Sequence, residues 1–161
     1  MKALLSLLLV AIAVNPCQSE AAKSPKAPFS ISISPEKQVV KPGSEVSIKI
    51  RLTNTSNRHM NASASYYGVV DASYQQEVWN DAGNLAERYQ AGQPQPVASL
   101  HGTVKLRTLR PGESWENVSA ISPQYDMSQP GQYVIRLSRL ISDNPKKGIV
   151  KSNKIVVMVA P

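Results

Sequence analysis

The chain is poor in the residue types that build catalytic and metal centres. Its 161 residues include one cysteine and two histidines. The histidines, His59 and His101, are far apart in sequence and fall in predicted loops, so no Cys/His cluster or His-Glu-x-x-His motif is available for zinc. There is also no Gly-x-Ser-x-Gly elbow, no glycine-rich phosphate loop and no EF-hand spacing. We therefore expect no enzymatic activity, no cofactor and no metal.

The sequence also lacks an apolar run long enough to cross a membrane. The longest one, residues 4–14, is interrupted by Ser6 and falls short of the roughly 20 apolar residues that a spanning helix needs. Lys2 precedes it, and a polar segment with small residues, 18–22, follows it. This order predicts a signal peptide over residues 1–22, cleaved near Ala21 or Ala22, rather than an N-terminal strand or helix of the domain. Residues 23–28 are a Pro-containing linker, and we expect a secreted or periplasmic protein.

The lone cysteine, Cys17, lies within the predicted signal. A bacterial lipoprotein signal would place small residues before it, whereas Val14-Asn15-Pro16 stands here. We therefore expect Cys17 to leave with the signal rather than to be acylated. The mature domain, residues 29–161, would then depend on its hydrophobic core alone for stability.

Acidic residues are outnumbered by basic ones, 11 to 18, which gives a formal charge of +7. Such an excess favours contact with acidic surfaces. The basic residues are spread along the chain, however, and only Lys146 and Lys147 are adjacent. We expect mostly a solvated surface, with a protein or an anionic glycan surface as partner and no nucleic acid; the oligomeric state stays open.

Apolar and polar residues alternate with a period of two, the pattern of half-buried strands. The apolar members of four such runs are Phe29, Ile31 and Ile33; Val46, Ile48, Ile50 and Leu52; Val104 and Leu106; and Tyr133, Ile135 and Leu137. Residues 155–159 are apolar on both sides, as in a strand covered on both faces or ending the core. Further strands are expected near 63–70 and 74–80. The pattern predicts an all-β, antiparallel β-sandwich of seven or eight strands.

Proline–glycine corners precede three of these strands. They are Pro42-Gly43, Pro111-Gly112 and Pro130-Gly131. Proline presets the second residue of a β-turn, and glycine accepts the positive φ that a type II turn requires at the third. Such corners before alternating strands are typical of a sandwich.

The runs around these corners resemble bacterial immunoglobulin-like modules. Residues 39–56 resemble the second strand of such modules and the loop after it, and residues 109–114 and 125–133 resemble their second half. The pattern is also similar to the non-catalytic sandwich that precedes the protease domain of some secreted zinc endopeptidases. The resemblance implies that Tyr133 is a tyrosine corner, and that Ile135 takes the core position of an antibody disulfide cysteine.

Aromatic residues are few but gather in the middle of the chain, where basic residues accompany them. Flat aromatic surfaces beside planar polar groups bind sugars, and they also grip single-stranded nucleic acid. The alternative is that Trp79 and one of the tyrosines belong to the core. The candidate binding residues are Tyr66, Tyr67, Tyr74, Trp79, Arg88 and Tyr89.

The segment Asn80-Asp81-Ala82-Gly83-Asn84 allows two interpretations. Loop carboxylates and carbonyls at strand ends can build calcium sites. The same residue types also form ordinary turns, in which Asp and Asn bond to their own backbone. We expect the turn.

Together these features predict a non-enzymatic, exported binding or structural module of the cell envelope that binds a glycan or a protein. Two alternatives stay open. One is a protease-inhibitor-like sandwich that presents the Pro-rich loop 92–96, and the other is an accessory domain of a secreted enzyme.

Overall fold

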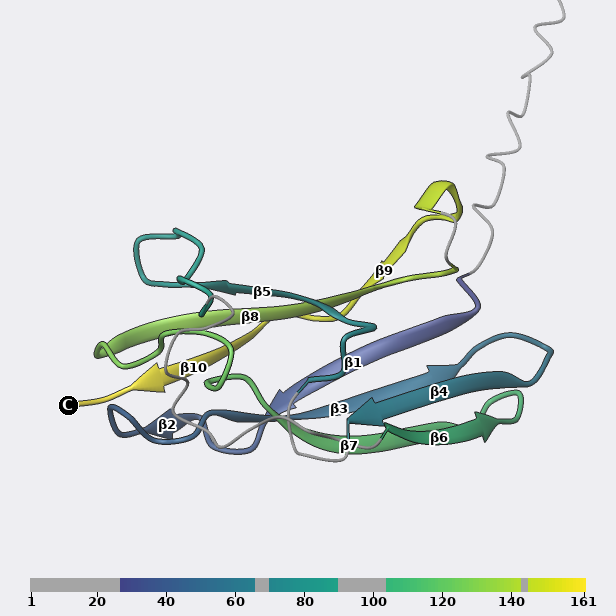
Figure 1. Cartoon of the computed structure of the whole chain (residues 1–161), viewed down its shortest axis with the longest axis horizontal. Coiled ribbons are helices and arrows are strands. Elements are labelled where there is room, and N and C mark those ends of the chain that lie inside the picture. The colour runs from purple at the N-terminus through teal and green to yellow at the C-terminus, as the bar shows by residue number, and fades with distance from the viewer. Residues whose placement is uncertain (1–26, 66–69, 90–103, 143–144) are drawn as a thin grey trace, which may run out of the picture.

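The computed structural model describes residues 27–65, 70–89, 104–142 and 145–161. Within these ranges the chain is almost entirely strand and turn (Figure 1). The elements are β1 (Phe29–Pro35), β2 (Val39–Val40), β3 (Ser47–Asn54), β4 (Met60–Ser65), β5 (Gln75–Trp79), β6 (Val104–Leu109), β7 (Ser114–Ala120), β8 (Gly131–Leu140), the short 3-10 helix η1 (Pro145–Lys147), β9 (Ile149–Lys151) and β10 (Ile155–Val159). No helix in the described ranges is long and apolar enough to cross a membrane.

The strands form two facing layers. One layer contains the sheet β1-β3-β7, and the other contains β2-β10-β8-β5 with β9 paired to β8. Strands β4 and β6 pair with each other and run beside β3 and β7 in the lower layer of Figure 1. Every pairing between these strands is antiparallel except that of β2 with β10, which is parallel. The all-β, mainly antiparallel fold that the sequence predicts is thus confirmed.

The core fills the space between the layers, and alternation places its residues correctly in three strands. The inward apolar residues are at most 5% exposed: Phe29, Ile31 and Ile33 of β1, Ile48, Ile50 and Leu52 of β3 with the preceding Val46, and Tyr133, Ile135 and Leu137 of β8. Their polar neighbours on β1 and β3 are exposed or partly exposed. Ile135, at the centre of β8, has no exposed surface. These positions alternate because successive side chains of a strand lie on opposite faces of its sheet.

Strand β6 contradicts the predicted alternation. Leu106, expected to point inward, is 78% exposed, whereas Leu109 is fully buried. Leu109 lies opposite Met60 at the end of the β4–β6 pair that reaches the core. Because the buried residue is an odd-numbered one, the predicted inward and outward faces of this strand are reversed. Lys105 and Arg107 share the side of Leu109 yet are exposed, so most of the strand lies beyond the cover of the other layer.

Strand β10 is covered on one face only. Its alternate residues Ile155, Val157 and Val159 are buried, but Val156 is 48% exposed. Of the two predicted alternatives, cover on both faces is therefore wrong for this strand, and a strand at the limit of the core is left. The described ranges also contain ten strands rather than seven or eight, and the additional ones are short, with two residues in β2 and three in β9.

Two of the three proline–glycine corners are closed β-turns. The N–H of Ser44 donates to the carbonyl of Lys41, and that of Glu113 to Arg110, each over 3.0 Å. Their glycines have φ values of 73° and 77°, close to the value that the third residue of a type II turn requires. Gly131 differs, with a φ of 148° at the first position of β8.

Tyr133 lies just beyond that third corner. Its side chain is buried, with 5% exposed, and its hydroxyl donates a hydrogen bond of 3.1 Å to the carbonyl of Gln129. The hydroxyl therefore ties the start of β8 back onto the preceding loop.

Candidate ligand-binding face

The outer faces of the two layers differ in chemistry. The outer face of β1 and β3 carries Ser30, Ser32, Ser34, Lys49 and Arg51, as expected for a solvated surface. The outer face of β5, β8 and β10 instead carries apolar side chains and unpaired positive charge. Its residues lie in three rows that cross the strands, and we call this surface the β5–β8–β10 face.

The middle row is apolar. Trp79 of β5 is opposite Val134 of β8, which is opposite Val156 of β10. Trp79 and Val134 are partly exposed, and Val156 is 48% exposed. Opposed residues of neighbouring strands lie close enough for their side chains to touch. The row is therefore a continuous apolar strip across three strands, with an indole at one end.

The second row is charged and lies beside the indole. Glu77 is opposite Arg136, and the two form an ion pair over 2.6 Å. The guanidinium of Arg136 and the ammonium of Lys154 each lie 5.2 Å from the centre of the Trp79 ring. Cations at this distance from an indole are attracted by the electrons of the ring. The two cations thus fix the position of Trp79 and hold positive charge next to it.

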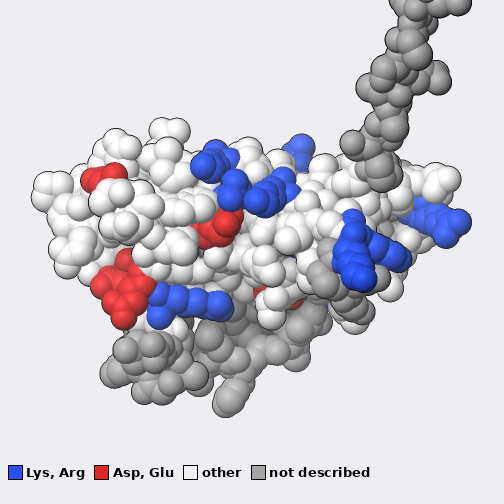
Figure 2. Space-filling view, turned by 90° about the horizontal axis from the view of Figure 1, so that it is seen from above, with Lys and Arg blue, Asp and Glu red and all other residues white. Residues whose placement is uncertain are grey.

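The cations around Glu77 lower the pKa of its carboxyl group. The hydrogen bond from Arg136 lowers the pKa of Glu77 below its ordinary value, and the charges of Lys151 and Lys154 lower it further. One carboxylate therefore faces three cations, which leaves this part of the face positive. Figure 2, which looks onto this layer, shows a group of Lys and Arg side chains near the middle of the face with an acidic side chain beside them.

The third row begins at Gln132 of β8, which Asp81 contacts, and continues through apolar side chains on β10 and β2. The carboxylate of Asp81 accepts a hydrogen bond from the backbone N–H of Gln132 at the start of β8. A Cβ on the neighbouring Gly131 would lie 2.8 Å from the Asp81 carboxylate, so only glycine fits there without a shift. Gln132 is opposite Met158 on β10, and Met158 is opposite Val39 on β2.

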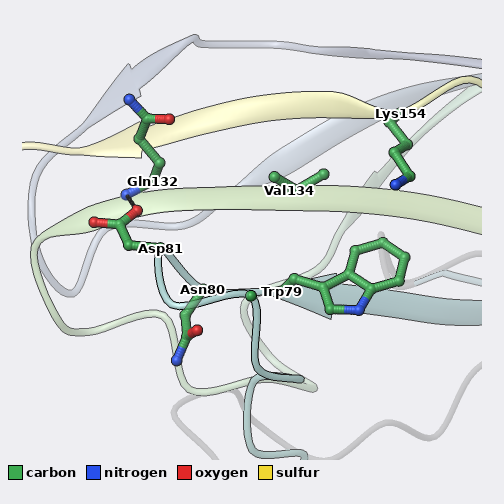
Figure 3. Close-up of a pocket in the computed structure, with 7 residues that line it drawn as sticks. Trp79, Asn80, Asp81, Gln132, Val134 and Lys154 are labelled. Carbon is green, nitrogen blue, oxygen red and sulfur yellow. Dashed lines mark hydrogen bonds between the residues drawn. The ribbon is translucent and has the colours of Figure 1, made fainter.

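A groove of about 540 Å³ runs along these rows (Figure 3). Trp79 and Lys154 lie at one end of it, Gln132 and Asp81 at the other, and Val134 between them. Residues 80–84 form a turn beside the groove. Two backbone hydrogen bonds of 2.9 Å close this turn, from the Gly83 N–H to the Asn80 carbonyl and from the Asn80 N–H to the Asn84 carbonyl. The predicted turn is confirmed, and no group of three potential metal ligands occurs among the described residues.

The structure divides the aromatic residues that the sequence singles out. Tyr74 is buried, with 6% exposed, and lines a hollow of about 460 Å³ together with Arg88 and Tyr89. Trp79 is not part of that hollow and lies on the β5–β8–β10 face. Tyr66 and Tyr67 lie outside the described residues. The single predicted cluster is therefore not one site, because Tyr74 and Trp79 occupy different faces of the layer.

Several polar side chains that line the hollow around Tyr74 are already hydrogen-bonded to one another. The side-chain amide of Gln76 donates to Gln124 over 2.7 Å, and Arg88 donates to the same Gln124 oxygen over 3.3 Å. These contacts explain Arg88 and Tyr89 as residues that tie the segment after β5 to the loop before β8. The open groove beside Trp79 is the better binding site.

Sequence reasoning missed the partners of Trp79. The alternation of residues 133–137 places Arg136 on the outward side of its strand, and nothing in the sequence distinguishes Lys151 and Lys154 from the other basic residues. The signal was the outward parity of Val134 and Val156, since exposed valines on neighbouring strands are unusual on a solvated sheet face. That these cations and valines lie beside Trp79 depends on the order of the strands in the sheet, which cannot be predicted from the local sequence pattern.

The face combines an indole, an apolar strip, uncompensated cations and side-chain amides. Such a surface can stack on the C–H face of a sugar ring and bind a carboxylate or sulfate group beside it. No protein-family model matches the chain, and no curated protein matches its sequence.

Proposed function

We propose that this protein is an exported, non-enzymatic immunoglobulin-like module that binds acidic saccharide chains of the cell envelope through its β5–β8–β10 face. The observation that carries the proposal is Trp79, a partly exposed indole with Arg136 and Lys154 each 5.2 Å from its centre. The lining residues are spread along β8, from Trp79 and Lys154 at one end to Gln132 and Asp81 at the other (Figure 3), which suits a chain more than a small compact ligand.

The order of the strands supports the immunoglobulin-like assignment. In that fold, strands A, B and E share one sheet, and C, F and G share the other. Here β1, β3 and β7 share one sheet, and β5, β8 and β10 share the other. Tyr133 and its bond to Gln129 occupy the place of the tyrosine corner. The pairing of β4 with β6 departs from the common pattern, in which the fourth strand pairs with the fifth.

The export assignment rests on residues 1–22, which have the order of a signal peptide and lie outside the described residues. A domain that loses Cys17 with its signal folds without disulfides. The protease-inhibitor alternative would use residues 92–96, which also lie outside the described residues, and no contact favours it.

Acidic saccharides fit this face better than neutral ones because of its charge. Among the described residues, none of the three ion pairs includes Lys154, and Glu77 offsets only one of the three cations. A uronate or sulfate group would pair with Lys154 while its ring covers the apolar strip. Charge-assisted hydrogen bonds of this kind are about twice as strong as neutral ones.

The proposal is tested by titrating the protein with polygalacturonate and, in parallel, with neutral dextran of matched length. We expect saturable binding of polygalacturonate that weakens as salt is raised, because the charges are exposed. We expect little or no binding of dextran.

Matched lysine variants locate the site. Lys154→Ala should weaken polygalacturonate binding by about threefold to tenfold, equivalent to about 0.6–1.4 kcal/mol. Lys49→Ala, an exposed lysine on the outer face of the other layer, should change it by less than about 1.5-fold. Equal losses in both variants, or equal binding of dextran, would refute a site on this face.

A further inference from the structure

A second hollow lies at the end of the sandwich where the layers diverge. It has a volume of about 580 Å³ and lies between the start of β1, the loop from β3 to β4, residues 72–75 and the end of β8. Its lining combines basic, polar and apolar side chains, including Phe29, Arg58, His59, Ser73, Arg139 and Ile141. None of them belongs to the β5–β8–β10 face.

Arg139 lies at a position where the alternation of residues in β8 predicts a core side chain. The inward side of β8 carries Tyr133, Ile135 and Leu137, all buried, and Arg139 is the next residue on that side. Its guanidinium lies 5.6 Å from the centre of the Phe29 ring and 5.6 Å from that of Tyr74. Two aromatic rings from different layers therefore hold one cation at the end of the core.

This cation has no carboxylate partner among the described residues. The three ion pairs there join other residues. The buried carboxylate of Asp71 accepts hydrogen bonds from the N–H of Ser73 over 2.8 Å and from the hydroxyl of Ser63 over 3.4 Å. Within the described ranges, Nη1 of Arg139 and the hydroxyl of Ser73 are buried and have no hydrogen-bond partner.

An unpaired charge and unsatisfied polar atoms cost free energy in a partly buried setting. An anion in the hollow would offset that cost. Arg58 and His59 are exposed at the same hollow and add donors to it. The apolar side chains of Phe29, Met60, Leu140 and Ile141 favour a ligand with a carbon body over a bare inorganic ion.

We propose that this end hollow binds a small organic anion whose carboxylate or phosphate group pairs with Arg139. A guanidinium presents parallel N–H donors that match either group. The site is separate from the β5–β8–β10 face, so it could exist whether or not that face binds saccharides.

The test is a titration of the protein, labelled with ¹⁵N, with benzoate and with phenyl phosphate at constant ionic strength. We expect saturable shifts of the amide resonances of Ser73, Arg139 and Ile141 with at least one of the two. The tighter ligand identifies the anionic group. Acetate and inorganic phosphate should bind more weakly, because they lack the apolar body.

Variants decide whether Arg139 is responsible. Arg139→Gln should weaken binding by about tenfold or more, the loss expected for a hydrogen bond to a charged group. Arg51→Gln, an exposed arginine on the outer face of the other layer, and Trp79→Ala should leave it within about twofold. Should Arg139→Gln fail to fold, Arg58→Gln at the exposed rim takes its place, with an expected loss of about threefold.

Three outcomes would overturn the proposal. The first is that neither aromatic anion causes saturable shifts. The second is that the shifts map to the groove beside Trp79 and vanish in Trp79→Ala. The third is that the variant of Arg139, or of Arg58 in its place, binds as tightly as the unmodified protein.

Discussion

Asn54 donates a hydrogen bond from its side-chain amide to the carbonyl of Leu109 over 3.0 Å, although 55 positions separate the two residues. The same amide nitrogen donates to the carbonyl of Arg58 over 2.7 Å, and the amide oxygen accepts from the N–H and the hydroxyl of Ser56. Asn54 has no exposed surface. It thus joins the end of β3, the loop after it and the end of β6.

Asn54→Ala should lower the free energy of unfolding by about 1–3 kcal/mol, because the buried carbonyl of Leu109 loses this donor and the part-buried carbonyl of Arg58 loses one of its two. Asn57→Ala, in the same loop but exposed, should cost less than about 0.5 kcal/mol. Urea denaturation of both variants measures the difference. Equal effects would mean that the bonds of Asn54 do not hold these three segments together.

Gly131 and Asp81 should be coupled. Gly131→Ala places a Cβ against the Asp81 carboxylate at a backbone φ of 148°, so we expect a loss of about 1–3 kcal/mol. In Asp81→Ala the contact is gone, and the same glycine substitution should cost less. A double-mutant cycle should therefore give a coupling of about 0.5–3 kcal/mol. Additive effects would show that Asp81 does not restrict this position.

Tyr133→Phe should cost about 1–3 kcal/mol, because the carbonyl of Gln129 loses the hydroxyl that bonds it. Tyr89→Phe is the matched control, since Tyr89 is half-buried and its hydroxyl makes no hydrogen bond with any described residue. We expect less than about 0.5 kcal/mol for the control. Denaturant midpoints that rank the two variants in the opposite order would contradict the role given to Tyr133.

Stability should fall in alkaline solution. Burial raises the pKa of Tyr74 above its ordinary 10.0, an effect that the nearby charge of Arg139 reduces. Tyr74 in the unfolded chain therefore loses its proton at a lower pH than in the folded protein. The unfolded state is then stabilised relative to the folded state, and the free energy of unfolding falls as the pH rises through about 10. Tyr74→Phe should flatten the decline in the free energy of unfolding between about pH 9.5 and 11, measured by urea denaturation. An unchanged slope would show that Tyr74 ionises alike in both states.

Local alternation predicted the inward residues of β1, β3 and β8, because each of these strands has one face against the other layer. It failed for Leu106, whose strand lies mostly beyond that cover. In β10 every residue is apolar, so the sequence did not show that the face with Val156 is exposed. Coverage depends on the order of strands in the sheets, which joins distant parts of the chain. Arg139 could have been identified as inward from its parity with Leu137, but its aromatic neighbours could not.

The candidate site shows the same limit. Trp79 could be singled out because aromatic and basic residues gather in that part of the sequence. The cations beside it are Arg136 of β8 and Lys154, which directly precedes β10. Both follow Trp79 by more than 50 residues, and only the pairing of the strands brings them close to it. Tyr74 looked equivalent to Trp79 in sequence, yet it faces the core.

The central claim is that acidic saccharides bind at Trp79, and its fluorescence tests this most directly. In a Trp115→Phe variant Trp79 is the only indole left, because the chain has two tryptophans. Polygalacturonate should change its emission saturably, with a dissociation constant equal to that from calorimetry, and neutral dextran should not. Trp79→Ala should weaken the calorimetric affinity by about tenfold or more. Polygalacturonate binding that leaves the Trp79 emission unchanged and survives Trp79→Ala would contradict the claim.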